Sequence, residues 1–245
     1  MRICLLVATL AVLTSPVVAD VSEEVNALMD HLKYGTTDNR VVAAMLLGYS
    51  NDSRVVDPLI EALNDEETLV RYWAVFSLGN AGDPKAVDPL INLLQDETYI
   101  LVRGQIAETL GKLNDTRAIP ELESIVNNNI DPYSVKASSY GALVKLGQTE
   151  YLPFVIEALT NEDETVRTNA ALDLGDIADP TTVDPLIKAL RDEEYLVRGS
   201  AAVALGNIGD PKAIDALTYM AKNDENEANR VSAEEALEAI NATST

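Results

Sequence analysis

The sequence predicts an all-α fold, a solenoid of about seven stacked helix pairs. A segment of 31 to 33 residues recurs along the 245-residue chain, and a basic residue marks the same place in every copy. A leucine follows that basic residue seven positions later without exception. Aromatic residues make up only 5% of the chain, so Ala, Leu and Val would form the core and let helices lie close together.

The basic residues define the repeat, and we call them the anchor residues. They are Arg40, Arg71, Arg103, Lys136, Arg167, Arg198 and Arg230. An aspartate lies six positions before three of them, as Asp65, Asp192 and Asp224, and Asp96 lies seven positions before Arg103. Stacked repeats would bring these carboxylates close to the anchor residues of their own or neighbouring units. We therefore expect a structural ladder and not a set of catalytic cations.

Each copy has the pattern of two helices joined by a short acidic turn. The first helix carries a Leu-Ile-x-x-Leu stripe, and the second carries Val-Arg-x-x-Ala-x-x-x-Leu-Gly. Two prolines five positions apart, such as Pro84 and Pro89, stand at the beginning of the first helix. An aspartate precedes each of these prolines and provides a helix cap. We expect the first helix to begin with a short turn and to bend before its main body.

The residue eleven positions after each anchor residue predicts how the second helix ends. Successive units carry Asn51, Gly82, Asn114, Gly147, Ala178 and Gly209 at this position. Glycine and asparagine tolerate a positive φ better than other residues, so five of these six positions suit a left-handed helix cap.

Residues 20–242 form one predicted repeat domain, and residues 243–245 form a tail. The units are about 21–51, 52–82, 83–114, 115–147, 148–178, 179–209 and 210–242. Residues 1–19 have the pattern of a signal peptide, with Arg2 before an apolar run and Ala19 at the cleavage position. We expect a secreted or extracytoplasmic protein of the cell envelope. The alternative is an uncleaved anchor, for which the apolar run is short.

The formal net charge of −22 excludes whole classes of partner. Nucleic acid and anionic membrane surfaces are bound through basic footprints, which this sequence does not have. Acidic pairs at the turns, such as Asp65-Glu66 and Asp192-Glu193, suit either weak cation binding or the positive end of a helix dipole. The only cysteine is Cys4, inside the predicted signal peptide, so we expect no thiolate metal site, and we expect no cofactor.

The pattern resembles the HEAT repeat, in particular the short-repeat type found in phycobilin lyase subunits and in deoxyhypusine hydroxylase. The residues that carry the resemblance are Pro58, Pro89 and Pro185 in first helices, Asp65 and Asp192 in turns, and the pairs Val70-Arg71 and Val197-Arg198. It covers residues 21–242 and implies a right-handed α–α superhelix. The hydroxylase resemblance would require repeated His-Glu pairs as iron ligands. The only histidine is His31, so this sequence has none.

The second unit carries the candidate partner-binding patch. Tyr72, Trp73 and Phe76 follow Arg71 at positions where other units have small or polar residues, and Met45 occupies a matching position in the first unit. In a HEAT-like array the second helix lines the concave surface, where exposed aromatic residues suit a binding hot spot. The alternative is that these large side chains only fill a local gap.

The fourth unit departs most from the repeat. Lys136 replaces arginine, Val144 replaces a glycine, and Tyr140 stands at an alanine position, with Asn127 to Asn129 in place of the turn acid. This predicts a bend or a second recognition site, of which Tyr140 would be part, unless it is only drift within a modular array.

We expect an exported acidic scaffold, not an enzyme, that holds a protein or peptide on its concave face. The alternatives are an enzyme or enzyme subunit of the lyase or hydroxylase branch, and a structural component of a cell envelope. Three sequons begin at Asn51, Asn114 and Asn241 and would be glycosylation sites in an exported protein. For Asn51 and Asn114, the predicted cap position is a sufficient structural explanation.

Overall fold

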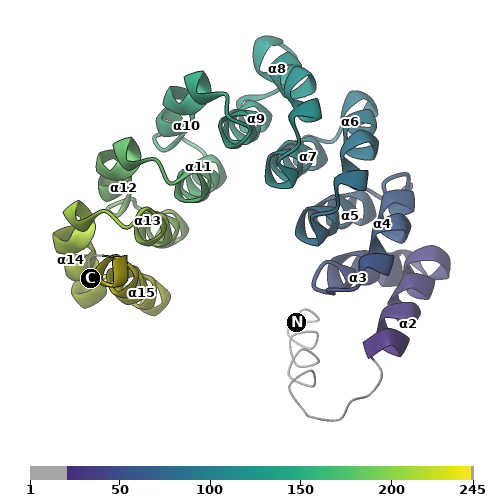
Figure 1. Cartoon of the computed structure of the whole chain (residues 1–245), viewed down its shortest axis with the longest axis horizontal. Helices are drawn as coiled ribbons and strands as arrows, with labels where there is room; N and C mark the ends of the chain where they lie inside the picture. Colours follow the sequence, from purple (N-terminus) through teal and green to yellow (C-terminus); the bar gives the residue numbers. More distant parts are fainter. Residues whose placement is uncertain (1–20, 244–245) are drawn as a thin grey trace.

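A computed structural model describes residues 21–243, which form an arc of paired helices (Figure 1). The outer layer consists of α2 (Val21–Tyr34), α4 (Val56–Ala62), α6 (Val87–Asp96), α8 (Ile119–Asn127), α10 (Leu152–Ala158), α12 (Val183–Ala189) and α14 (Ile214–Asn223). The inner, concave layer consists of α3 (Thr37–Leu47), α5 (Thr68–Ala81), α7 (Ile100–Leu113), α9 (Tyr133–Lys145), α11 (Glu164–Ile177), α13 (Tyr195–Ile208) and α15 (Glu227–Thr243). The predicted all-α solenoid of seven helix pairs is confirmed.

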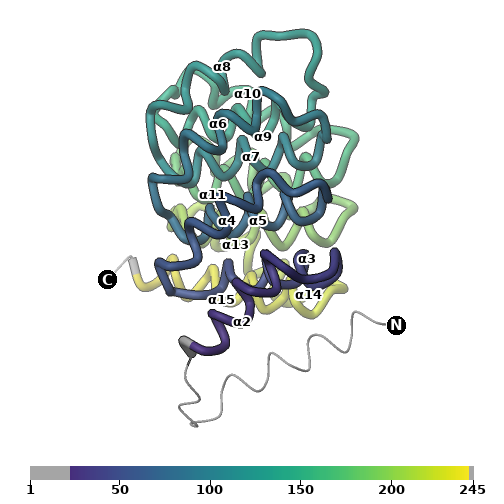
Figure 2. The backbone as a smooth tube through the Cα atoms, turned by 90° about the vertical axis from the view of Figure 1, so that its right-hand side faces the viewer, coloured from purple at the N-terminus to yellow at the C-terminus, as the bar shows by residue number. Residues whose placement is uncertain are grey.

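The two ends of the arc lie on the same side of the molecule. In the side view of Figure 2, α8 lies at the crest, and α2, α3, α14 and α15 lie at the opposite edge. The predicted signal peptide, residues 1–19, falls outside the described residues, as do residues 244–245 of the predicted tail. In residues 21–243, no helix is both long and apolar enough to cross a membrane.

A short 3-10 turn precedes most outer helices, as the paired prolines predict. The turns are η2 (Ser53–Val55), η3 (Pro84–Ala86), η4 (Thr116–Ala118), η5 (Thr149–Tyr151), η6 (Pro180–Thr182) and η7 (Pro211–Ala213). An aspartate caps all of these except η5. At η7, for example, an Asp210 carboxylate oxygen accepts a hydrogen bond of 2.8 Å from the Lys212 backbone N–H. This bond satisfies a donor that a helix start would otherwise leave unpaired.

Five inner helices are followed by a left-handed residue, but not the five that the sequence predicts. Gly82, Asn114, Gly147 and Gly209 have positive φ, and so does Ala178, with φ of 53°. Asn51 does not, so its predicted cap role is wrong. The reason is that α3 ends early: Gly48 remains right-handed with φ of −67°, and the chain has left the helix before it reaches Asn51.

Neighbouring inner helices touch through a glycine in five of their six contacts. The glycine stands eight positions after the anchor residue and meets a small or hydroxyl side chain of the next helix. A Cβ added at Gly111 would lie 2.7 Å from the Cα of Ala142, and one added at Gly206 would lie 2.9 Å from the Cα of Ala236. Only glycine allows backbones to approach this closely.

The contact between α9 and α11 is the exception, and we call it the α9–α11 joint. Val144 stands at the glycine position, and the opposite position on α11 is Asp173. These two helices make the sparsest contact of any successive inner pair. The buried apolar residues divide at the same place into one cluster from Val25 to Leu146 and a second from Val144 to Ile240. The departure of the fourth unit from the repeat therefore coincides with a boundary between two hydrophobic cores.

Candidate functional site

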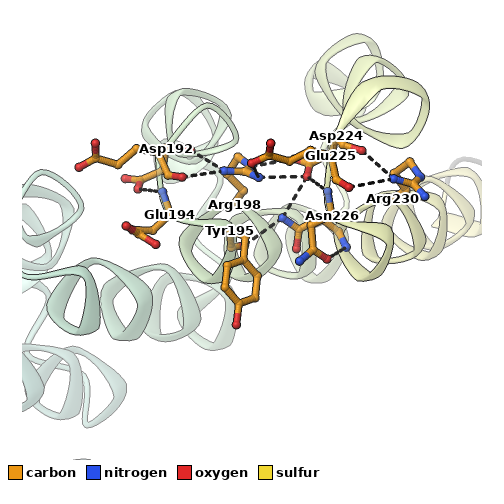
Figure 3. A network of polar contacts seen from close by, with 10 residues as sticks. Asp192, Glu194, Tyr195, Arg198, Asp224, Glu225, Asn226 and Arg230 are labelled. Carbon is orange, nitrogen blue, oxygen red and sulfur yellow. Dashed lines mark hydrogen bonds and ion pairs between the residues drawn. The ribbon is translucent and has the colours of Figure 1, made fainter.

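The anchor residues form the predicted ladder along one edge of the arc. The Arg198 guanidinium donates hydrogen bonds of 2.7 and 3.1 Å to the Asp224 carboxylate in the next unit (Figure 3). It also donates to the backbone carbonyl of Asp192, at 2.9 Å, in its own unit. The Asp224 carbonyl in turn accepts a hydrogen bond of 2.8 Å from Arg230. Asp65, Glu97, Asp192 and Asp224 each join two units in this way, because the side chain and the carbonyl accept from successive anchor residues.

The ladder contains one wrong prediction and one missing ion pair. Asp96 forms no ion pair with an anchor residue. The adjacent Glu97 forms an ion pair of 2.7 Å with Arg71, and Asp131 forms one of 2.7 Å with Arg103. Lys136 donates instead to the backbone carbonyl of Asn128. Among the described residues no carboxylate lies within ion-pair distance of Lys136, because the turn position in the next unit is Asn161. The missing ion pair falls at the α9–α11 joint.

The concave face is hollowed into a groove on both sides of this joint. A cavity of about 510 Å³ is lined by residues of α5, α7, α9 and α11 and by Val155 and Ala158 of α10, and we call it the concave groove. Tyr72 and Phe76 form one wall, and Ile100 and Leu101 at the start of α7 form another. The groove lies beside the joint, where the glycine contact of the other inner helix pairs is absent.

The most exposed apolar residues of the groove are ones that the sequence analysis did not identify. Ile100 is 51% exposed and Leu101 is 75% exposed. Leu101 stands two positions before its anchor residue, where α5 has Leu69 and α13 has Leu196, which are also exposed. This recurrence is the sequence signal that could have identified Leu101, because an apolar residue that repeats outside the core stripe is not explained by packing in the core.

The predicted aromatic patch is present, but only part of it faces the groove. The rings of Tyr72 and Trp73 pack edge to face with their centroids 5.4 Å apart, and those of Trp73 and Phe76 do so with their centroids 5.5 Å apart. Tyr72 and Phe76 line the groove, while Trp73 is half-buried against the core and does not line it. Met45, on α3, is also half-buried and lies outside the lining.

Tyr140 lies in a separate aromatic cluster at the joint. Its ring stacks on those of Phe154 and Tyr151, with centroid separations of 4.8 Å and 5.9 Å. Tyr140 and Tyr151 pack against both hydrophobic clusters. The structure therefore places Tyr140 as a bridge between the two cores, apart from Tyr72 and Phe76.

Two carboxyl groups in the groove have raised pKa values. Partial burial in the groove raises the pKa of Glu108, although its side chain stays open to water on one side, and the nearby Asp173 carboxylate raises the pKa further. Burial also raises the pKa of Asp173, although the Lys145 ammonium, 2.8 Å from its carboxylate, acts to lower that pKa. Lys145 is shared with Asp176, also at 2.8 Å. Within residues 21–243, no three potential metal ligands among His, Cys, Asp and Glu gather into a metal site.

Comparison with known proteins identifies the fold family. The HEAT repeats profile matches residues 25–110, 57–143, 98–172 and 152–238. A chain in the complex of CpcE and CpcF of phycocyanin lyase from Nostoc sp. PCC7120 has a TM-score of 0.68 and 24% identity, covering 94% of this chain and 96% of that chain. Human deoxyhypusine hydroxylase in complex with glycerol has a TM-score of 0.48 and 20% identity, covering 90% and 96%. No curated protein matches by sequence.

These identities show a shared fold alone, while the matched segments span most of the chain. With its ladder of anchor residues and its stacked helix pairs, this chain belongs to the HEAT repeat family.

Proposed function

We propose that the protein is a non-catalytic scaffold that binds a protein or peptide partner in the concave groove. The observation that carries the proposal is the exposed apolar surface of Ile100 and Leu101, which line the same cavity of about 510 Å³ as Tyr72 and Phe76. Apolar side chains held open to water on a rigid helical layer are typical of an interaction surface. The expected absence of catalysis rests on the sequence, in which His31 is the only histidine.

A pair of matched variants tests this proposal. Leu101→Ser removes an apolar contact inside the groove, and Leu196→Ser makes the same change at the same repeat position outside it. Both side chains are more than half exposed, so neither change should affect folding. We expect Leu101→Ser to weaken capture of the native partner about tenfold, while Leu196→Ser leaves it unchanged. Equal capture by both variants would contradict the proposal.

We further propose that the mature protein is exported, which is supported by the signal-peptide pattern of residues 1–19. The intact mass of protein purified from its native source tests this. We expect a mass that corresponds to cleavage after Ala19, and an uncleaved chain would contradict it. The same spectrum shows whether the exposed residues Asn51, Asn114 and Asn241 carry glycans.

A further inference from the structure

The charges that line the concave groove have a single sign. Its lining contains three carboxylates, Glu108, Asp163 and Asp173, and no lysine, arginine or histidine. The nearest lysine, Lys145, already pairs with Asp173 and Asp176 and does not line the cavity. The groove is therefore an apolar cleft with an acidic floor, and its charge is only partly compensated.

Glu108 is the carboxylate that remains for a ligand, because Asp163 caps α11 and Asp173 pairs with Lys145. It stands five positions after its anchor residue, where α5 carries Phe76 and α11 carries Leu172. Partial burial raises the pKa of Glu108, and the charges of Lys112, Lys145, Asp173 and Asp176 also act on it. Neither Lys112 nor Lys145 forms an ion pair with Glu108, so a cation placed beside it would gain a direct partner.

The walls suit the remainder of a basic side chain. Tyr72 and Phe76 present aromatic surface, and Ile100 and Leu101 present aliphatic surface, at the same cavity. Lysine and arginine carry long apolar stems that pack on such surfaces while the charged end reaches a carboxylate. An aromatic wall adds attraction for the cation.

The exposed leucines indicate that the ligand is extended. Leu69, Leu101 and Leu196 occupy the same repeat position on α5, α7 and α13 and are 58%, 75% and 52% exposed. They recur along the inner layer of the arc, which Figure 1 shows to be continuous from α3 to α15. A chain that crosses α5 and α7 could place one apolar side chain at Leu69 and one at Leu101, whereas Leu196, on α13, lies outside the groove and is not part of this contact.

We propose that the occupant of the concave groove is an extended peptide segment of the partner, with basic and apolar residues, whose lysine or arginine pairs with Glu108. This inference rests on the proposed function, because it identifies the chemistry of the partner that the groove binds. The protein's net charge of −22 favours the approach of such a segment from a distance.

Synthetic peptides test the inference on the full chain. One fluorescently labelled peptide carries arginine and leucine residues with glycine and serine between them, and a second has glutamate in place of each arginine. Binding is measured by fluorescence anisotropy at low and at high salt. We expect the basic peptide to bind at least about tenfold more tightly than the acidic one, with an affinity that falls as salt rises.

A matched pair of variants assigns the effect to Glu108. Glu108→Gln removes the proposed partner charge, and Glu235→Gln makes the same change at the same repeat position on α15, outside the groove. Both residues are exposed, so both variants should fold. We expect Glu108→Gln to weaken binding of the basic peptide about tenfold and Glu235→Gln to change it less than about twofold.

The outcomes separate this inference from the proposed function. Equal effects of Glu108→Gln and Glu235→Gln, equal binding of the two peptides, or no binding of either would overturn the basic-peptide inference. The proposed function would still stand if Leu101→Ser, but not Leu196→Ser, weakened capture of the native partner. It would fail together with the inference if those two leucine variants behaved alike.

Discussion

Single residues decide how closely the inner helices approach one another. Glycine at the fixed repeat position allows the close contacts, and Val144 removes this possibility at the α9–α11 joint. Asp173 then packs over a different glycine, Gly141, whose added Cβ would lie 2.1 Å from an Asp173 carboxylate oxygen. The replaced glycine is visible in the sequence. The burial of Asp173 cannot be read from the sequence, because it depends on how α9 and α11 pack against each other.

Replacing Gly141 tests this packing. Gly141→Ala should lower the melting temperature, because the new methyl group would displace the Asp173 carboxylate that Lys145 holds. Gly104→Ala, in the neighbouring helix α7, is the control: its Cβ would meet only the Ser138 hydroxyl, at 3.7 Å. The control should stabilise the fold by up to about 1 kcal/mol, since alanine is the better helix former. If both variants were stabilised equally, the packing of Asp173 on Gly141 would be wrong.

The ladder predicts a dependence of stability on pH. The hydrogen bonds from Arg198 lower the pKa of Asp224 in the folded protein. The ion pair of Asp224 therefore contributes fully to stability above the unfolded-state pKa of an aspartate, about 4. This contribution is lost as the pH falls through the lower pKa of Asp224 in the folded protein. We expect Asp224→Asn to reduce the free energy of unfolding by about 2 kcal/mol at neutral pH and by less in acid.

The neighbouring acid provides the control for that measurement. Glu225 lies 3.5 Å from the same guanidinium, but its side chain is 86% exposed. Glu225→Gln should cost less than about 1 kcal/mol at any pH, because water screens an exposed pair. Urea unfolding at a series of pH values measures both variants, and equal losses would contradict the assigned role of Asp224.

The helix boundaries show which elements the sequence can predict. Aspartate caps and prolines act on residues within one turn, so the starts of the outer helices follow from local chemistry. The ends of the inner helices follow less directly, because Ala178 adopts a positive φ of 53° that alanine does not favour by itself. The pairing of Arg71 with Glu97 and not Asp96 depends on contact between units. Local sequence patterns do not determine it.

Restoring the missing ion pair tests whether the ladder stabilises the contact between neighbouring units. Asn161→Asp together with Lys136→Arg recreates the pair that joins the other units. We expect the double variant to gain about 1 kcal/mol, and we expect slower hydrogen exchange at the start of α11. A double-mutant cycle measures the coupling between the two changes. If the effects of the single variants were simply additive, the two positions would not form a pair.

The whole molecule consists of two hydrophobic cores in one continuous arc. The repeat period predicts the solenoid, because each unit packs mainly on its neighbours. The division at the joint and the concave groove beside it arise from departures at several positions, including Val144, Asn161 and Asp173. The sequence shows that the fourth unit departs from the repeat. Only the structure shows that Tyr140 packs against both hydrophobic cores.

Two cores predict that the protein does not unfold in a single step. The only tryptophan, Trp73, packs against the first core, so its fluorescence reports on that part, while circular dichroism reports on all helices. We expect the two urea transitions to occur at different midpoints, as in repeat proteins whose cooperativity is interrupted. The variant with the restored ion pair should bring them closer together. Coincident transitions in the wild-type protein would contradict a weak joint.

The central claim is that the partner occupies the concave groove, and site-specific photo-crosslinking tests it most directly. A photoreactive phenylalanine analogue replaces Leu101 in one protein and Leu196 in another, both exposed and at the same repeat position. After irradiation in the native extract, we predict a cross-linked partner peptide from position 101 and none from position 196. Equal cross-linking at both positions, or cross-linking from position 196 alone, would contradict the claim.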